Sequence, residues 1–279
     1  MMNDEGGDST YLRYPTFVLL KNSNLLPDPL MEEPHSTTFE NQLIELESVD
    51  STNNYAMGRI HEGLARDGMV CLTHHQWAGK GQREKSWQSE PRQNLMMSLI
   101  IEPGSLLLTQ QFLFSAAIAL GILDTIPSFE INNWSVKWPN DIYWNDRKAA
   151  GILIESVIQG QHWPFAVVGV GMNLNQESFP ADIPNAISLK QITGKNYDPV
   201  SVAREMVSAI QNQISNLKKD PTGILKTYNQ FLYKNGQPIA LKKRNEIIIT
   251  DLKGVDSTGL LITEAGSFSF GEVHFMLNA

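Results

Sequence analysis

Three strongly apolar runs most constrain how this chain can fold, because side chains of this kind must be buried. The runs lie at residues 69–72, 94–101 and 165–170. Each is short and ends in polar or glycine-rich sequence, which is typical of strands inside a protein. Residues 106–123 place Ala, Leu and other apolar residues at helical spacing, so they predict a core helix.

Further elements follow from alternating residues and from residues that cap helices. Ser51 or Thr52 suits the first position of a helix, and Asp198 suits the N-cap of another. Asn145-Asp146 between two apolar segments predicts the turn of a β-hairpin. The predicted elements are strands at 43–49 and 147–155 and helices at 52–65, 199–217 and 222–233.

The sequence changes character at Gly236, from long elements to short strands separated by turns. Their regular spacing predicts a small all-β barrel, with a domain boundary near Asn235. Residues 1–38 are polar and contain scattered prolines, so they predict a flexible leader with one strand at 14–20. The predicted domains are 1–38, 39–235 and 236–279, and the predicted barrel strands are 238–241, 247–250, 260–263 and 267–270.

Composition excludes several classes of protein. The net charge of −8 argues against a nucleic acid as the main partner, because phosphates need a basic face. The one cysteine, Cys71, cannot form an internal disulfide, which fits a reducing compartment. The histidines lack zinc-ligand spacing. No apolar run approaches about 18 residues, and no signal peptide pattern opens the chain, so neither a membrane span nor secretion is expected.

The segment from Gly79 to Trp87 has the composition of a loop that binds an anion. Its two glycines let the backbone approach a ligand, and Lys80, Arg83 and Lys85 put three cations on one short loop. Trp87 offers a flat surface on which a ring system could stack. The alternative is a mobile, solvated basic loop, and the residues alone do not separate the two.

A second unusual segment, Lys137-Trp138-Pro139-Asn140-Asp141, places charges between the apolar residues Val136 and Ile142. Buried charges are costly unless they are paired or bind a ligand, so one alternative is an ion pair between Lys137 and Asp141. For Lys148 the alternative to a ligand contact is a solvated hairpin end. Gly169-Val170-Gly171 after a strand does not predict a dinucleotide fold, because the third glycine and the following helix are lacking.

Together these motifs resemble those of the biotin–protein ligases. The resemblance runs from about residue 41 to the C-terminus, and it identifies the short class that lacks an N-terminal DNA-binding domain. Five ordered motifs carry it: Ser51-Thr52-Asn53, Gly79-Lys80-Gly81-Gln82-Arg83, Lys137-Trp138-Pro139-Asn140-Asp141, Lys148-Ala149-Ala150-Gly151-Ile152-Leu153 and Gly169-Val170-Gly171-Met172-Asn173.

The resemblance implies an α/β fold, a mixed sheet flanked by helices like the class II synthetase core, followed by an SH3-like barrel. It implies a ligase that joins biotin to ATP as biotinyl-5′-adenylate, with Mg²⁺, and then acylates a lysine of a biotin carboxyl carrier protein. That carrier would be a domain of a biotin-dependent carboxylase such as acetyl-CoA carboxylase. A cytoplasmic location, no nucleic acid or membrane partner, and a homodimer are the associated expectations.

The family's functional residues carry over onto matching positions of this sequence. Lys148, Arg83 and Lys137 would serve catalysis, and Asp141 would contact Mg²⁺. The residues implied for biotin are Ser51, Thr52, Asn53, Gln76, Lys80, Gly81, Gln82 and Lys148. Those implied for ATP and the adenylate are Arg83, Lys85, Trp87, Asn140, Asp141 and Asn173.

Two residues depart from the family's pattern. Gln82 stands where many members have Arg, and Glu84 where they have Gly, which bears on the closed shape of the loop and its hold on the adenylate. We expect activity because Lys80, Arg83, Lys137 and Lys148 remain. The competing hypotheses are a lipoate or octanoyl transferase of the same core fold, and a non-catalytic biotin or adenylate binder or a repressor.

Overall fold

The computed structural model describes residues 17–21, 38–83, 85–126 and 133–276. The strand predicted at 14–20 is observed as β1, Phe17–Lys21. Apart from this strand and Thr38, the predicted leader lies outside the described residues, and so does Glu84.

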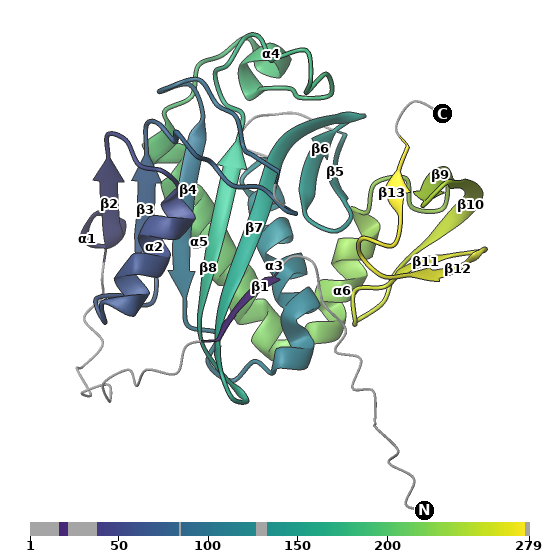
Figure 1. Ribbon diagram of the computed structural model, residues 1–279, viewed down its shortest axis with the longest axis horizontal. Coiled ribbons are helices and arrows are strands. Elements are labelled where there is room, and N and C mark those ends of the chain that lie inside the picture. Colours follow the sequence, from purple (N-terminus) through teal and green to yellow (C-terminus); the bar gives the residue numbers. More distant parts are fainter. Residues whose placement is uncertain (1–16, 22–37, 84, 127–132, 277–279) are drawn as a thin grey trace, which may run out of the picture.

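A mixed β-sheet forms the centre of the larger part of the chain (Figure 1). Its first two strands are parallel to each other, and every other neighbouring pair along the main order is antiparallel. β1 lies parallel to β7, beyond the part of β7 that pairs with β6. The main order is β2 (Leu43–Leu46), β3 (Val70–Thr73), β4 (Leu95–Ile101), β8 (His162–Met172), β7 (Arg147–Gln159), β6 (Asp141–Trp144) and β5 (Trp134–Lys137).

Helices cover both faces of this sheet, as expected for strands that are apolar throughout. α3, α5 and α6 pack against one another on one face, and α2 lies on the other (Figure 1). Among the helices of the described residues, none is long and apolar enough to cross a membrane. The helices are α1 (Phe39–Gln42), α2 (Thr52–His61), the 3₁₀ turn η1 (Leu108–Gln110), α3 (Gln111–Asp124), α4 (Leu189–Thr193), α5 (Pro199–Lys219) and α6 (Pro221–Gln230).

The predicted starts of α2 and α5 are confirmed, but the helix predicted from residue 106 begins at Gln111, after the 3₁₀ turn η1. The helix predicted at 222–233 begins at Pro221 and ends at Gln230. The Asp198 carboxylate accepts from the backbone N–H of Ser201 at 2.9 Å, as an N-cap does. Ser51 occupies the N-cap position of α2 without a side-chain cap bond. α2 ends before the predicted Ala65 because Gly63 takes a left-handed φ of 70°. The strand predicted at 43–49 ends at Leu46.

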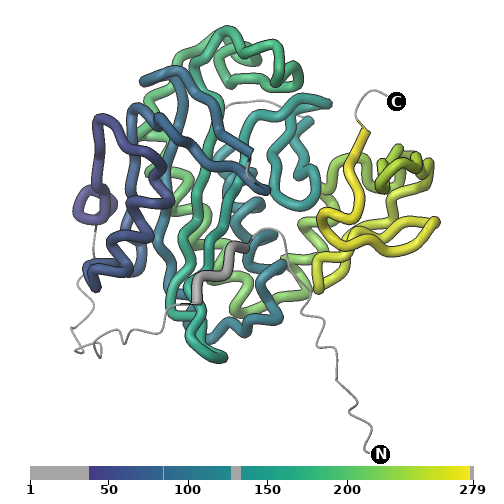
Figure 2. The backbone as a smooth tube through the Cα atoms, in the orientation of Figure 1, coloured from purple at the N-terminus to yellow at the C-terminus, as the bar shows by residue number. Residues whose placement is uncertain are grey.

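The predicted change of texture after Gly236 corresponds to a second, antiparallel sheet, drawn in yellow-green and yellow at one side of the main sheet (Figure 2). The predicted turns are present, but β10 is longer than expected and β13 was not predicted. Apolar side chains of both sheets join one core, so the boundary near Asn235 stays a prediction. The strand order is β12 (Gly266–Phe268), β11 (Leu261–Thr263), β10 (Glu246–Val255), β9 (Pro238–Lys243) and β13 (His274–Phe275).

Candidate functional site

A cavity of about 480 Å³ lies on the α2 face of the main sheet. It is lined by the start of α2, the loop 79–87, the turn between β5 and β6, the first half of β7, the end of β8, and the segment from β12 to β13. Every residue that the sequence singled out for a site lines this cavity. They are Ser51, Thr52, Asn53, Gln76, Lys80, Gly81, Gln82, Arg83, Lys85, Trp87, Lys137, Asn140, Asp141, Lys148 and Asn173.

Glycines on one face of β7 and β8 leave the room for the cavity. Gly151 and Gly171 are paired across the two strands, and Gly169 pairs with Leu153. The alternate residues of β8, such as Val168 and Val170, point to the core on the opposite face. The Gly169-x-Gly171 motif therefore forms a cavity floor.

Trp87 lies on that floor. A Cβ at Gly171 would overlap its indole ring, and one at Gly151 would come within 3.2 Å of it. The Lys148 ammonium is 5.7 Å from the ring centre. Stacking on adenine stays a prediction, and in this structure the ring packs against backbone and a cation.

The glycine loop is closed by backbone hydrogen bonds. The N–H of Gly81 donates to the Lys85 carbonyl at 2.7 Å, and the N–H of Trp87 donates to the Gly79 carbonyl at 2.9 Å. Arg83, between these bonds, has a left-handed φ of 53°. This geometry turns the loop back over the cavity, and its cations line the cavity, which favours the anion-binding interpretation over a solvated loop.

Arg83 also joins the loop to the second sheet. Its guanidinium carbon is 4.5 Å from the centre of the Phe270 ring. A Cβ at Gly271 would overlap the guanidinium, so the absence of a side chain there creates the space that Arg83 occupies.

Asp141 forms its ion pair with Lys148, at 2.7 Å, and not with Lys137 as one alternative had it. The Lys137 ammonium lies 5.1 Å from the Tyr143 ring centre and 5.5 Å from that of Phe275. The alternative of a solvated hairpin end for Lys148 was wrong, because its side chain is paired and its backbone is bonded to residues 185–187.

The cavity is electropositive although the chain is acidic. Among the described residues, its lining includes five cations and two carboxylates, those of Asp141 and Asp182. Burial lowers the pKa of Lys137, against the opposing effect of Asp141. The pKa of His274 is also lowered, first by burial and then by the charge of Arg83 and its neighbours. Such a cavity suits an anionic ligand. The cations are Lys80, Arg83, Lys85, Lys137 and Lys148.

One wall of the cavity is polar and uncharged. The backbone N–H and the hydroxyl of Thr52 lie 2.7 and 3.2 Å from Oε1 of Gln76. Asn140 and Asn173 are buried, and their amide groups donate to the backbone carbonyls of Ile152 and Ile187. These two asparagines brace the cavity in this structure, and a contact to ATP stays a prediction.

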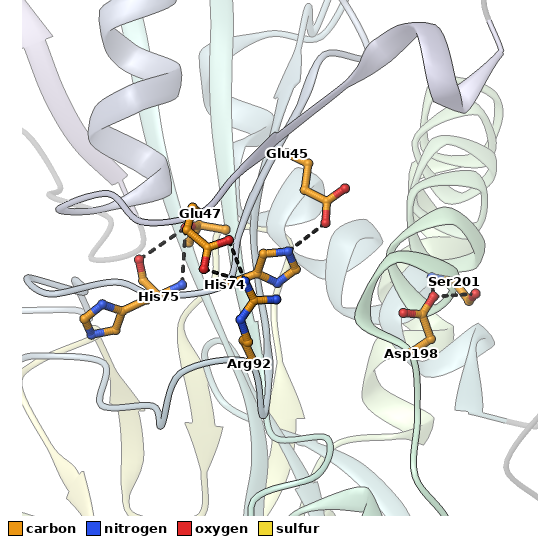
Figure 3. A network of polar contacts seen from close by, with 8 residues as sticks. Glu45, Glu47, His74, His75, Arg92, Asp198 and Ser201 are labelled. Carbon is orange, nitrogen blue, oxygen red and sulfur yellow. Dashed lines mark hydrogen bonds and ion pairs between the residues drawn. The ribbon is translucent and has the colours of Figure 1, made fainter.

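Gln76 is held by the pairing of its loop with the edge strand β2. Val49 N–H donates to the His75 carbonyl at 3.0 Å. Figure 3 shows His74 facing Glu45, at 2.7 Å, and Arg92 facing Glu47, at 2.6 Å. These contacts lie beside the cavity and position the loop that carries Gln76.

Within the described residues, no three His, Cys, Asp or Glu side chains are grouped as a metal site. Asp141 lines the cavity, where it forms its ion pair with Lys148. One carboxylate is what a magnesium ion needs when phosphates supply the rest of its ligands.

The sequence analysis missed the part of the cavity that the second sheet supplies. The residues are Phe270, Gly271, Val273, His274 and Phe275, with residues 182–186 from the loop before α4. No spacing or composition signal marked them, because they reach the cavity only through the packing of the two sheets.

Comparisons with known proteins show which family the chain is similar to. The model of the biotin/lipoate A/B protein ligase family matches residues 45–173. A biotin–[acetyl-CoA-carboxylase] ligase of Paracoccus denitrificans is 31% identical over 225 residues, which cover 78% of this chain and 92% of that protein. The bifunctional ligase/repressor BirA of Bacillus spizizenii is 25% identical over 268 residues, 94% of this chain and 82% of BirA. The structure of an Aquifex aeolicus biotin protein ligase in complex with biotin and ATP superposes with a TM-score of 0.70 at 26% identity, covering 84% of this chain and 98% of that one.

Proposed function

The chain belongs to the biotin–protein ligase family, and from this premise we propose that it forms biotinyl-5′-adenylate from biotin and ATP and transfers biotin to a lysine of a carrier protein. The observation that carries the proposal is the cavity itself. It joins a polar wall, suited to an uncharged polar ring, to a group of cations, suited to phosphates.

In the first step a carboxylate oxygen of biotin attacks the α-phosphorus of ATP. The bond from that phosphorus to the bridging oxygen breaks, and pyrophosphate leaves. Two anions must approach each other, so fixed cations lower the barrier. We assign this task to Lys148 and Lys137, with Arg83 and Lys85 over the phosphates.

In the second step the ε-amine of the carrier lysine attacks the acyl carbon of the adenylate. The bond from that carbon to the phosphate oxygen breaks, AMP leaves, and the new amide loses a proton to solvent. The loop 79–87 would cover the adenylate between the steps and keep water from it.

Magnesium fits this site as a companion of ATP. Asp141 would hold it together with the phosphates, and the ion would neutralise part of their charge. Lys148 and Asp141 form an ion pair in this structure, so ATP binding would redistribute these two charges.

Biotin is favoured over lipoate by the polar wall. The ureido ring of biotin has N–H donors and a carbonyl acceptor, which need partners when buried. Thr52 and Gln76 offer such partners. The dithiolane ring of lipoate has no N–H or carbonyl group to bond with them.

For the acceptor, we propose the carrier domain of a biotin-dependent carboxylase such as acetyl-CoA carboxylase. We place the reaction in the cytoplasm, where ATP is available and the free thiol of Cys71 would stay reduced. A homodimer stays a prediction of the family resemblance.

The decisive experiment incubates the protein with ATP, Mg²⁺, biotin and a carrier domain and weighs the carrier by mass spectrometry. We expect one biotin adduct on one lysine. A carrier without the adduct contradicts the proposed function. Calorimetric titration with biotin and with lipoate separates the two transferase classes, and tight lipoate binding without biotin binding would reverse the assignment.

A further inference from the structure

A chain of buried polar side chains runs beneath the cavity, from β7 to its polar wall. Oε2 of Glu155, on β7, accepts from Nδ2 of Asn53 at 2.7 Å. Oδ1 of Asn53 is 2.6 Å from the hydroxyl of Ser98, which is itself 2.7 Å from the hydroxyl of Thr52. Thr52 then contacts Oε1 of Gln76. Neither Glu155 nor Ser98 is among the predicted site residues.

The orientation of each member of this chain follows from the carboxylate. An ionised carboxylate only accepts hydrogen bonds, so Asn53 must turn its NH₂ group to Glu155 and its oxygen to Ser98. The single hydroxyl proton of Ser98 then goes to Asn53. The oxygen of Ser98 is left to accept.

The two chain members that line the cavity, Thr52 and Gln76, are oriented in the same way. The hydroxyl proton of Thr52 is directed to Ser98 or to Oε1 of Gln76, both inside the protein, so its oxygen acts as an acceptor toward a ligand. Oε1 of Gln76 accepts from the backbone N–H of Thr52 at 2.7 Å. Its Nε2 is therefore turned toward the glycine loop, where a Cβ at Gly79 would come within 3.1 Å of it.

Burying the carboxylate of Glu155 costs free energy of folding, which indicates that this chain of hydrogen bonds has a role in the site. Glu155 is only 6% exposed, and among the described residues no cation forms an ion pair with it. A buried carboxylate is expensive to desolvate, and the pairing of β7 with its neighbours does not require one at this position. Gly169 adds to the case, because a Cβ there would overlap Oδ1 of Asn53.

We propose that Glu155 and Ser98 are positioning residues that set the donor and acceptor polarity of the biotin wall through Asn53. Thr52 is thereby an acceptor for a ligand N–H, and Gln76 a donor for a ligand carbonyl, which is the pattern of a cyclic urea. Asn53 acts within this chain, since both ends of its amide are engaged inside the protein. The proposal rests on the proposed function and deepens it.

The test compares Glu155→Leu, Glu155→Gln and Ser98→Ala with the wild type and with Glu264→Gln, a change at an exposed ion pair. We expect Glu155→Leu to fold with a moderately lower melting temperature, because Asn53 loses its carboxylate partner and keeps only the longer contact with the Leu153 carbonyl, and to bind biotin about tenfold more weakly. The KM for biotin should rise, with the KM for ATP and kcat at saturating biotin unchanged within about twofold. Glu155→Gln, which keeps an acceptor of the same shape, should recover part of the affinity.

A measurement without ligand separates this proposal from the proposed function. NMR of the free protein should show that Glu155→Leu shifts the side-chain amide signals of both Asn53 and Gln76, although Gln76 does not touch Glu155. Unmoved Gln76 signals, or wild-type biotin affinity in Glu155→Leu, overturn the positioning role. If Glu155→Leu fails to fold, Ser98→Ala, which breaks the same chain between Asn53 and Thr52, gives the two readings in its place. If Glu155→Leu shifts these signals as expected but the wild type does not bind biotin, only the proposed function is contradicted.

Discussion

Lys148 has its ion-pair partner in Asp141, 2.7 Å away, and its ammonium also faces the Trp87 ring. It is one of several cations in a cavity that has few carboxylates, so its charge is available to an anionic reactant. At the scale of single residues, the site is thus a set of positive charges held close together at some expense in stability.

Lys148→Ala tests this charge directly. We expect the fold to be retained and pyrophosphate release to fall about 100-fold or more, the usual effect of removing a group that stabilises developing charge. Stability should change by about 1 kcal/mol or less, because the pair is partly exposed. Lys253→Ala, which removes an exposed ion pair with Glu264, is the matched control. Release at the wild-type rate would remove Lys148 from its proposed role.

Lys137→Met tests the cost of the buried charge. Burial lowers the pKa of Lys137 below its ordinary 10.5, so its charge opposes folding. Below the lowered pKa both the folded and the unfolded states are protonated, and the penalty is complete. Between that pKa and 10.5 only the unfolded state keeps the proton, so the stability of the wild type rises with pH in this window.

We therefore expect Lys137→Met to be more stable than the wild type by about 1 kcal/mol at neutral pH, with adenylate formation reduced. The difference in melting temperature should shrink as the pH rises through the window. Lys226→Met, at an exposed position on α6, should show no such trend. A variant less stable than the wild type at neutral pH would mean that the contacts of Lys137 with Tyr143 and Phe275 outweigh its burial.

At the scale of elements, the loop 79–87 is fastened by a contact with the turn between β12 and β13. Arg83 lies against the Phe270 ring and fills the space that Gly271 leaves open. The loop and the second sheet thereby form one side of the cavity. The glycines of β7 and β8 form its floor, where the lack of side chains leaves room for a ligand.

Gly271→Ala should release Arg83 from this contact. The new Cβ overlaps the guanidinium, which can swing away, so the chain folds but the loop loses its anchor. Hydrogen exchange should become faster in residues 79–87. Gly236→Ala is the control, because Gly236 has a similar left-handed φ of 71° and nothing within 4 Å of a Cβ. Equal exchange in the two variants would show that the contact does not hold the loop.

At the scale of the whole molecule, the two sheets share one apolar core although they differ in architecture. Trp138, in the turn that carries Lys137 and Asp141, donates to the Gly259 carbonyl of the second sheet at 3.0 Å. Asn229 of α6 makes two hydrogen bonds with the backbone of Val255. The second sheet therefore supplies one wall of the site.

This continuity predicts cooperative unfolding. Differential scanning calorimetry should show one transition whose calorimetric and van't Hoff enthalpies agree. Two separate transitions would contradict it and would make the predicted boundary near Asn235 a thermodynamic one. Trp138→Phe removes the hydrogen bond to Gly259 and keeps an aromatic ring. This variant should have a lower melting temperature, and its single calorimetric transition should broaden or separate into two.

Local patterns in the sequence were sufficient for most elements of the fold. Hydrophobic runs marked the buried strands, Asp198 marked the start of α5, and Asn145-Asp146 marked the hairpin. Each of these signals depends on residues that are close in sequence, so it could be recognised before the tertiary structure was known. The ends of β2 and α2 were misjudged, because neighbours in space and the left-handed Gly63 decide where they stop.

The site residues likewise fall into those that sequence motifs indicated and those that only the folded structure revealed. Matching motifs led to residues that all line one cavity, because each motif lies within a short segment. Glu155, Ser98, Phe270 and Gly271 escaped notice because their partners lie far away in the sequence: Glu155 meets Asn53 across 102 residues. The sequence by itself determined the elements and the chemistry that they carry. The tertiary structure alone decided which charges share a cavity, what orients its polar wall and which strand closes it, because these depend on contacts that form only when distant segments pack.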